Sequence, residues 1–233
     1  ETEERIEDLI PQGAIDAATR LVLTNAIYFN AAWQYPFSED LTKDGPFYLL
    51  DGEQVTVPMM QQTESFGYTE GEGYQAVELR YDGGKLSMVI LLPEDGNFED
   101  FEESLQAQGI DDIIDELYNA QVTLKMPKFE FESKFSLKDT LSEMGMPVAF
   151  SGGADFSGMI GSPDLFIDEV LHKAFVSVDE AGTEAAAATA VAMQCGMPAQ
   201  QVDVTIDRPF IFLIRDIDTG AILFVGRVPN PAA

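Results

Sequence analysis

The chain has 233 residues, of which 45% are hydrophobic, and it carries a formal net charge of -28 at pH 7. This length fits one large domain or two small ones, and the apolar content supports a substantial core. The charge argues against nucleic acid, anionic membranes and heparin-type polyanions as partners, and no run of about 18 apolar residues predicts a membrane span.

The first predicted element is a near-continuous apolar run at residues 21–29, rich in β-branched and aromatic side chains. This composition predicts a strand that is buried on both faces. Asn25 is a polar residue inside the run and needs a hydrogen-bond partner there. Trp33 is the only tryptophan and follows the strand. By themselves, Asn25 and Trp33 would be interpreted as ordinary core residues, with Asn25 bonded to backbone.

The next region is rich in strands. Asp82, Gly83 and Gly84 form a hairpin signal between two of them. The predicted strands span residues 54–60, 65–68, 74–81 and 85–92.

Two short amphipathic helices should follow, packed on the strands, because apolar residues recur at helical spacing. These residues are Phe98, Phe101 and Leu105, and then Ile110, Ile113, Ile114 and Leu117. Residues 122–131 then form a long predicted strand, and Pro127 within it indicates a bend between two sheets.

Ser136 is the predicted N-cap of a helix that runs to about Met144 and ends at Gly145. The Gly-rich residues 151–162 are predicted to form a loop with at most one helical turn. Residues 165–178 form the next predicted strand.

Residues 180–193 contain almost only small side chains. Alanine favours helices, and the composition alone is compatible with an Ala-rich linker or a helix end. Alternation instead places threonines and small apolar residues on one face and Glu184 with further alanines on the other. This pattern predicts a strand with one small, buriable face and one face that tolerates solvent.

No catalytic or metal-binding constellation is visible. His172 is the only histidine and Cys195 the only cysteine, so a serine triad, a zinc site and an internal disulfide all lack residues. Cys195 also lacks nearby basic residues that would activate its thiol. We therefore expect no catalytic residue, no metal and no cofactor, and we predict that the protein is not an enzyme.

Three long motifs carry a resemblance to a known family. They are H-K-A-F-V-S-V-D-E-A-G-T-E-A-A-A-A-T at 172–189, D-R-P-F-I-F-L-I-R at 207–215 and F-V-G-R-V-P-N-P at 224–231. The first resembles the hinge and proximal reactive-centre loop of an inhibitory serpin, and the other two resemble the C-terminal strands of serpins. The resemblance covers essentially the whole chain.

The resemblance implies a mixed α/β (α+β) serpin fold with sheets A, B and C and a mobile reactive-centre loop at about 180–200. Residues 1–233 would form the C-terminal two-thirds of a single serpin domain. Residues 1–18 resemble the connection after the sixth helix, so we expect about the first third of the usual chain to be absent.

The resemblance also implies a metastable fold and suicide inhibition of serine proteases. The cut loop would insert into sheet A between the strands that contain Asn25 and His172, which match the shutter residues. Trp33 matches the breach tryptophan. The residues that match the hinge are Glu180, Gly182, Thr183, Glu184, Ala185, Ala186, Ala187 and Ala188.

The family's usual spacing from Glu180 places the reactive bond between Gly196 and Met197, and the alternative is Cys195–Gly196. The Met197–Pro198 bond is disfavoured because a proline after the cut blocks most proteases. No lysine or arginine lies between Lys173 and Arg208, which argues against a trypsin-like target. The small side chains favour an elastase-like or subtilisin-like serine protease.

We expect a secreted, extracellular protein, although no signal-peptide pattern begins at Glu1. Two alternatives remain open. The chain could be a non-inhibitory serpin, such as a carrier or a chaperone-like protein, or an inactive truncated fragment. The small residues of the hinge favour inhibition, because non-inhibitory members tend to carry bulky or charged residues there.

Overall fold

The structure is a computed structural model that describes residues 6, 9–13, 15–17, 19–105, 107–162, 164–183 and 201–232. The chain divides into two compact units. Unit 1 comprises Glu1–Phe29 and Phe131–Val176, and unit 2 comprises Asn30–Glu130 and Ser177–Ala233.

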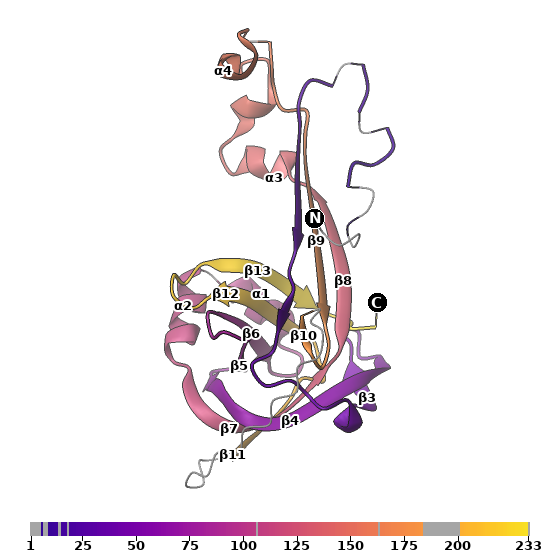
Figure 1. Cartoon of the computed structure of the whole chain (residues 1–233), viewed down its shortest axis with the longest axis vertical. Helices are drawn as coiled ribbons and strands as arrows, with labels where there is room; N and C mark the ends of the chain where they lie inside the picture. Colours follow the sequence, from indigo (N-terminus) through magenta and orange to yellow (C-terminus); the bar gives the residue numbers. More distant parts are fainter. Residues whose placement is uncertain are drawn as a thin grey trace. The chain divides into compact units, whose positions relative to one another are not determined.

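Unit 1 is built on three strands, with short helices beyond one end of them (Figure 1). Strand β9 pairs with β1 on one side and with β8 on the other. The elements are β1 (Val22–Tyr28), most of β8 (Phe129–Ser136), α3 (Lys138–Glu143), the 3-10 turn η2 (Pro147–Phe150), α4 (Ser157–Ile160) and β9 (Glu169–Val178).

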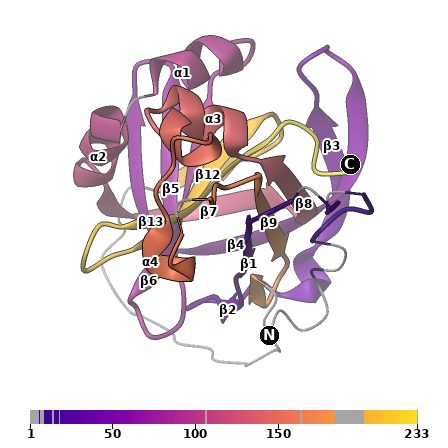
Figure 2. The same ribbon diagram turned by 90° about the horizontal axis from the view of Figure 1, so that it is seen from above.

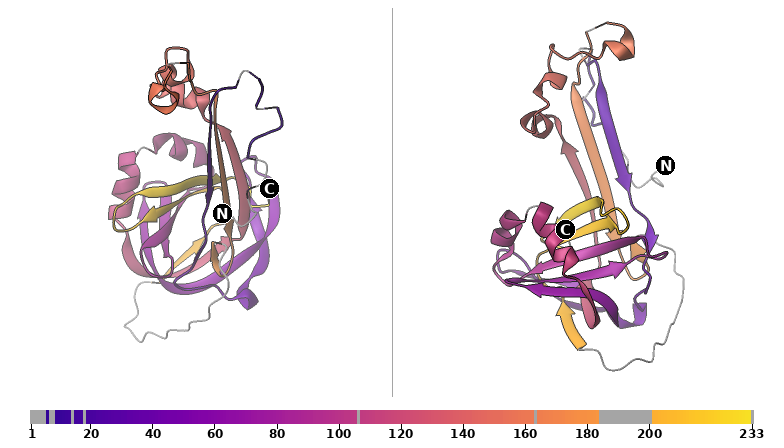
Figure 3. Two further views of the ribbon diagram at one scale, coloured as in Figure 1. Left: turned by 45° about the horizontal axis from the view of Figure 1, so that its top comes forward. Right: turned by 90° about the vertical axis from the view of Figure 1, so that its left-hand side faces the viewer.

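Strands β1 and β9 are parallel and lie side by side in both views of Figure 3. Their register is continuous from Val22 opposite Glu169 to Tyr28 opposite Phe175. No strand therefore separates β1 from β9 along this stretch.

The predicted strand at 21–29 is confirmed, but its predicted burial on both faces is wrong. Most of β1 is exposed, and Leu23 retains 42% of its accessible surface. Burial on both faces requires packed layers above and below a strand. Within the described residues, β9 is the only strand that pairs with β1.

Unit 2 contains an eight-stranded sheet in the order β11-β7-β4-β5-β6-β12-β13, with β3 also paired to β4. Its elements are β2 (Ala31–Ala32), η1 (Glu39–Leu41), β3 (Lys43–Tyr48), β4 (Gln54–Gly71), β5 (Tyr74–Arg80), β6 (Leu86–Pro93), α1 (Phe98–Ser104), α2 (Ala107–Asp115), β7 (Tyr118–Pro127), β10 (Gly182–Thr183), β11 (Gln201–Thr205), β12 (Phe210–Asp216) and β13 (Ile222–Val228).

Strand β4 joins regions that the sequence predicted as separate strands at 54–60 and 65–68. It is one strand of 18 residues. β7 pairs with it from Met59 to Tyr68, so the intervening residues also belong to the ladder. β3 pairs near the start of β4, and β5 pairs near its end.

The predicted helices α1 and α2 lie together on one side of β5 and β6 (Figure 2). Phe98 and Phe101 of α1 and Ile113 of α2 are buried against Val89 and Leu91 of β6. The predicted helical spacing is therefore the spacing of the residues that reach the core.

The chain bends after Pro127, where β7 ends in the large sheet and β8 begins beside β9, as the proline predicted. The predicted cap of α3 is wrong by one residue. Leu137 is the N-cap, and the Ser136 hydroxyl donates instead to Glu169 Oε1 at 2.7 Å. A tertiary partner thus outcompetes the local capping bond. Gly145 lies just past the helix, with φ of 110°.

Candidate functional site

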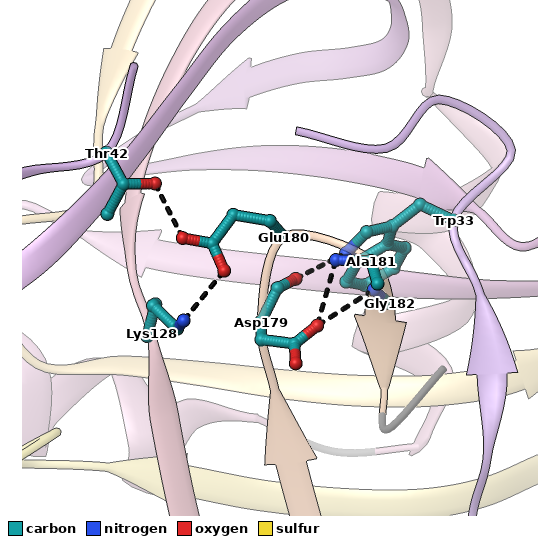
Figure 4. A network of polar contacts seen from close by, with 7 residues as sticks. All are labelled: Trp33, Thr42, Lys128, Asp179, Glu180, Ala181 and Gly182. Carbon is teal, nitrogen blue, oxygen red and sulfur yellow. Dashed lines mark hydrogen bonds and ion pairs between the residues drawn. The ribbon is translucent and has the colours of Figure 1, made fainter. Parts of the chain in front are cut away.

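The end of β9 turns sharply back on itself at residues 179–182 in unit 2 (Figure 4). Asp179 Oδ1 accepts hydrogen bonds from the backbone N–H groups of Ala181, at 2.8 Å, and Gly182, at 3.2 Å. The Asp179 N–H donates to the Gly182 carbonyl at 2.9 Å. Aspartate favours such turns because its short side chain can bond to backbone two residues ahead.

Trp33 stabilises this turn through two hydrogen bonds. Its indole Nε1–H donates to the Asp179 carbonyl at 3.0 Å, and its backbone N–H donates to the Ala181 carbonyl at 2.9 Å. The Glu180 carbonyl accepts from the Phe37 N–H at 2.8 Å. Trp33 is itself only 3% exposed. Every backbone carbonyl from Asp179 to Gly182 therefore has a partner, as buried backbone requires.

Glu180 carries a buried carboxylate within the turn. Lys128 Nζ lies 2.7 Å from Glu180 Oε2, and the Thr42 hydroxyl donates to Oε1 at 2.7 Å (Figure 4). Burial raises the pKa of this carboxyl, but the hydrogen bonds from Lys128 and Thr42 outweigh burial, so its pKa lies below its ordinary value. Glu180 is therefore held as a paired anion.

Strand β10 follows the turn and lies between two neighbours. Gly182 and Thr183 pair antiparallel with Ala32 and Ala31 of β2, and Thr183 also pairs with Val178 at the end of β9. Gly182 has φ of 155°, and a Cβ placed there would lie 2.3 Å from the Ala31 carbonyl oxygen. Only glycine fits this close approach of two backbones.

Thr183 is completely buried. Its hydroxyl oxygen lies 2.8 Å from the hydroxyl of Tyr81, which is also completely buried. The Tyr81 ring stacks on Trp33 with a centroid distance of 4.6 Å and an interplanar angle of 12°. Burial raises the pKa of the Tyr81 hydroxyl, partly offset by the bond to Thr183. Tyr81 remains protonated and able to donate.

Asn25 and His172 meet in unit 1, where they stand opposite each other in the β1·β9 register. Asn25 Oδ1 lies 3.1 Å from His172 Nδ1. The ring of Phe135 stacks on the imidazole at 6.3 Å. The partner that Asn25 required is therefore a side chain on the adjacent strand.

The predicted site residues thus fall into three sets. Trp33, Glu180, Gly182 and Thr183 are brought together at the turn. Asn25 and His172 are brought together between β1 and β9. The remaining predicted residues lie outside the described part of the chain; these are Glu184, Ala185, Ala186, Ala187, Ala188, Cys195, Gly196 and Met197.

Three residues of the site were not predicted from the sequence: Thr42, Tyr81 and Lys128. Tyr81 lies 102 residues from Thr183, and Lys128 lies 52 residues from Glu180. No local pattern marks such long-range pairs. The one signal in the sequence is Glu180 itself, because a carboxylate that becomes buried at the end of a strand needs a basic or hydrogen-bonding partner.

The described residues hold no group of three or more histidine, cysteine or acidic side chains that could bind a metal ion. None of the helices described for this chain has the length and apolar character needed to cross a membrane.

Comparison with known proteins identifies the family. The model of the family described as "Serpin (serine protease inhibitor)" matches residues 1–231. The chain belongs to the serpin family. Its relatives include an uncharacterized serpin-like protein of Thermococcus kodakarensis, with 44% identity over 234 residues. Leukocyte elastase inhibitor of Xenopus laevis shares 42% identity over 240 residues.

The structure agrees with this assignment. The crystal structure of human thyroxine-binding globulin superposes with a TM-score of 0.87 at 32% sequence identity, and the fold is therefore the serpin fold. All three comparisons cover 99% of this chain. The chain spans 54% and 63% of the two relatives and 61% of the solved chain.

Proposed function

We propose that this serpin inhibits a serine-type endopeptidase by acting as a suicide substrate. The protease serine would attack a carbonyl in the reactive-centre loop and form an acyl-enzyme, while the peptide after the cut leaves with its new amino terminus. The loop before the cut would then enter the sheet as an additional strand, as loop insertion does in serpins. The trapped protease could not complete hydrolysis.

The observation that carries this proposal is the position of β10. Gly182 and Thr183 already form a two-residue strand between β2 and the end of β9. Thr183 is small enough to be fully buried there. In unit 1, β1 and β9 still pair directly. Both observations support the proposal, because strand insertion would begin at the hinge and would later have to separate β1 from β9.

The roles of the remaining residues follow from this sequence of events. Insertion must separate β1 from β9, so the bond between Asn25 and His172 would open with the strands and act as a shutter. Trp33 would act at the breach by holding the turn while the loop moves. Glu180 would anchor the turn through Lys128 and Thr42.

We propose a target of elastase-like or subtilisin-like specificity, with Gly196–Met197 as the reactive bond and Cys195–Gly196 as the alternative. The small residues around this bond and the lack of basic residues from Ala174 to Asp207 support this class. The relative named leukocyte elastase inhibitor supports a serine protease partner. A secreted, extracellular location is part of the same proposal.

A carrier function is the second candidate, supported by the likeness to thyroxine-binding globulin. A carrier needs no insertion to complete a trap. The two candidates therefore differ in the products formed with a protease, and one experiment separates them.

The experiment mixes the protein, in the full length that its gene encodes, with an elastase-type and a subtilisin-type protease. We expect a complex that survives denaturing electrophoresis and a released peptide whose mass shows that it begins at Met197. In Thr183→Arg a charge would have to enter a fully buried position, so this variant should be cleaved without forming a complex. Cleavage of the unsubstituted protein without a complex would refute inhibition and favour a carrier.

A further inference from the structure

Tyr81 is a buried residue that lies directly beside the hinge. It follows β5, and its backbone bridges to Trp33 outside the named strands. Its hydroxyl reaches the Thr183 hydroxyl at 2.8 Å, and both residues have no exposed surface. Water therefore has no access to either hydroxyl in this state.

Two neighbouring side chains hold the two ends of the turn. Trp33 donates to the carbonyl of Asp179 where the turn begins. Tyr81 contacts the Thr183 side chain where β10 ends. The two rings are stacked on each other, so the positions of these contacts are coupled through one rigid aromatic pair.

We propose that the Tyr81 hydroxyl is a positioning group whose hydrogen bond keeps Thr183 paired between β2 and the end of β9. We call this bond the latch, and the arrangement with Thr183 paired and buried the seated hinge. Through this latch, Tyr81 favours entry of the cut loop into the sheet over its escape. The effect on the loop rests on the proposed inhibitory function, whereas the latch itself is a property of the hinge.

The chemistry of the buried pair explains why a hydroxyl is needed. Burying a threonine hydroxyl costs free energy if the hydroxyl finds no hydrogen-bond partner in the protein. Without the bond to Tyr81, Thr183 would therefore favour a state in which its side chain is exposed to water. The loss of one partner from a buried pair corresponds to about a fivefold to hundredfold change in an equilibrium constant. The seated state should lose stability by this factor relative to the exposed state.

Tyr81→Phe isolates this bond, because it removes the hydroxyl and retains a ring that can stack on Trp33. Tyr68→Phe is a matched control. Tyr68 is 1% exposed and lies in β4, and its hydroxyl bonds to Glu70 and Gln75 and not to a hinge residue. Thr183→Val and the double variant Tyr81→Phe/Thr183→Val complete a mutant cycle.

The first readout is hydrogen exchange at the amides of residues 180–183, which measures opening of the seated hinge directly. In Tyr81→Phe we expect exchange there to be about fivefold to hundredfold faster, with no comparable change in Tyr68→Phe. In the Thr183→Val background, Tyr81→Phe should have a much smaller effect. Equal exchange in Tyr81→Phe and the unsubstituted protein would overturn the latch, and so would an undiminished effect in the Thr183→Val background.

The second readout is the number of inhibitor molecules consumed for each protease molecule trapped. We expect Tyr81→Phe to raise this number while the rate of loop attack stays unchanged, because Tyr81 is not one of the residues next to the proposed reactive bond in the sequence. An unchanged number with faster hinge exchange would overturn the effect on loop entry. If the unsubstituted protein forms no complex at all, the proposed function fails, and the exchange measurement still decides the latch.

Discussion

At the scale of single residues, the hinge depends on the partners that compensate the negative charge of the Glu180 carboxylate. Glu180 is 8% exposed and its carboxylate contacts both Lys128 and Thr42. A buried carboxylate without such partners would be protonated or would leave the site. The anionic form of Glu180 is therefore part of what holds the turn, and we expect the hinge to open in acid.

The pKa of Glu180 lies below its ordinary value of 4.5, so the stabilisation is complete above that value and is lost as the pH falls through the lowered pKa. We expect the fluorescence of Trp33, the only tryptophan, to report this release in an acid titration. Lys128→Met removes the ammonium group that lowers the pKa of Glu180, so burial should raise that pKa and the turn should open at a higher pH. Lys43→Met, which removes an exposed lysine of β3, is the control. Identical titrations of all three proteins would contradict this role of Lys128.

The sequence allowed part of this hinge to be predicted, for a clear physical reason. Gly182 and Thr183 are small, and smallness is visible in the local pattern. The partners Tyr81 and Lys128 depend on which distant strands the fold brings together, and a local pattern carries no such information. For the same reason Ser136 was assigned to a helix cap, although its hydroxyl is bonded to Glu169, 33 residues away.

At the scale of elements, alternation and helical spacing predicted most strands and helices because these patterns reflect which side chains reach a core. Strand lengths were harder to predict. The residues that link the two predicted parts of β4 are held in the ladder by β7, which lies far away in the sequence. The exposure of β1 also depends on neighbours, since an apolar run shows what a strand can bury and not what packs on it.

The backbones of β10 and β2 approach each other so closely at Gly182 that a side chain has no room there. Gly182→Ala would place a Cβ 2.3 Å from the Ala31 carbonyl oxygen and 2.7 Å from Ala32 Cα. The two strands must then separate, and we expect a loss of about 1–3 kcal/mol in the stability of the seated hinge, with faster exchange at residues 180–183.

Gly83→Ala is the matched control for this substitution. Gly83 also has a positive φ, of 82°, but a Cβ there meets no atom within 4 Å. It therefore measures the backbone cost alone, at a site in the hairpin between β5 and β6. A hinge that exchanges at the same rate in Gly182→Ala as in Gly83→Ala would show that the approach to β2 does not require glycine.

At the scale of the whole molecule, each of the two units shows its own local state of the strands. Within unit 2 the hinge is seated beside β2, and within unit 1 β1 and β9 are paired without a strand between them. The family and its fold were recognisable from the motifs, whereas the state of the hinge became visible only in the structure.

The central claim is that the seated hinge is the first part of a strand that completes its insertion when the loop is cut. The most direct test cleaves the loop of the full-length protein and compares its thermal unfolding before and after the cut. Insertion would add a strand bonded on both sides between β1 and β9, so the account predicts a clear rise in the unfolding temperature. An unfolding temperature that is unchanged or lower after cleavage would contradict the account.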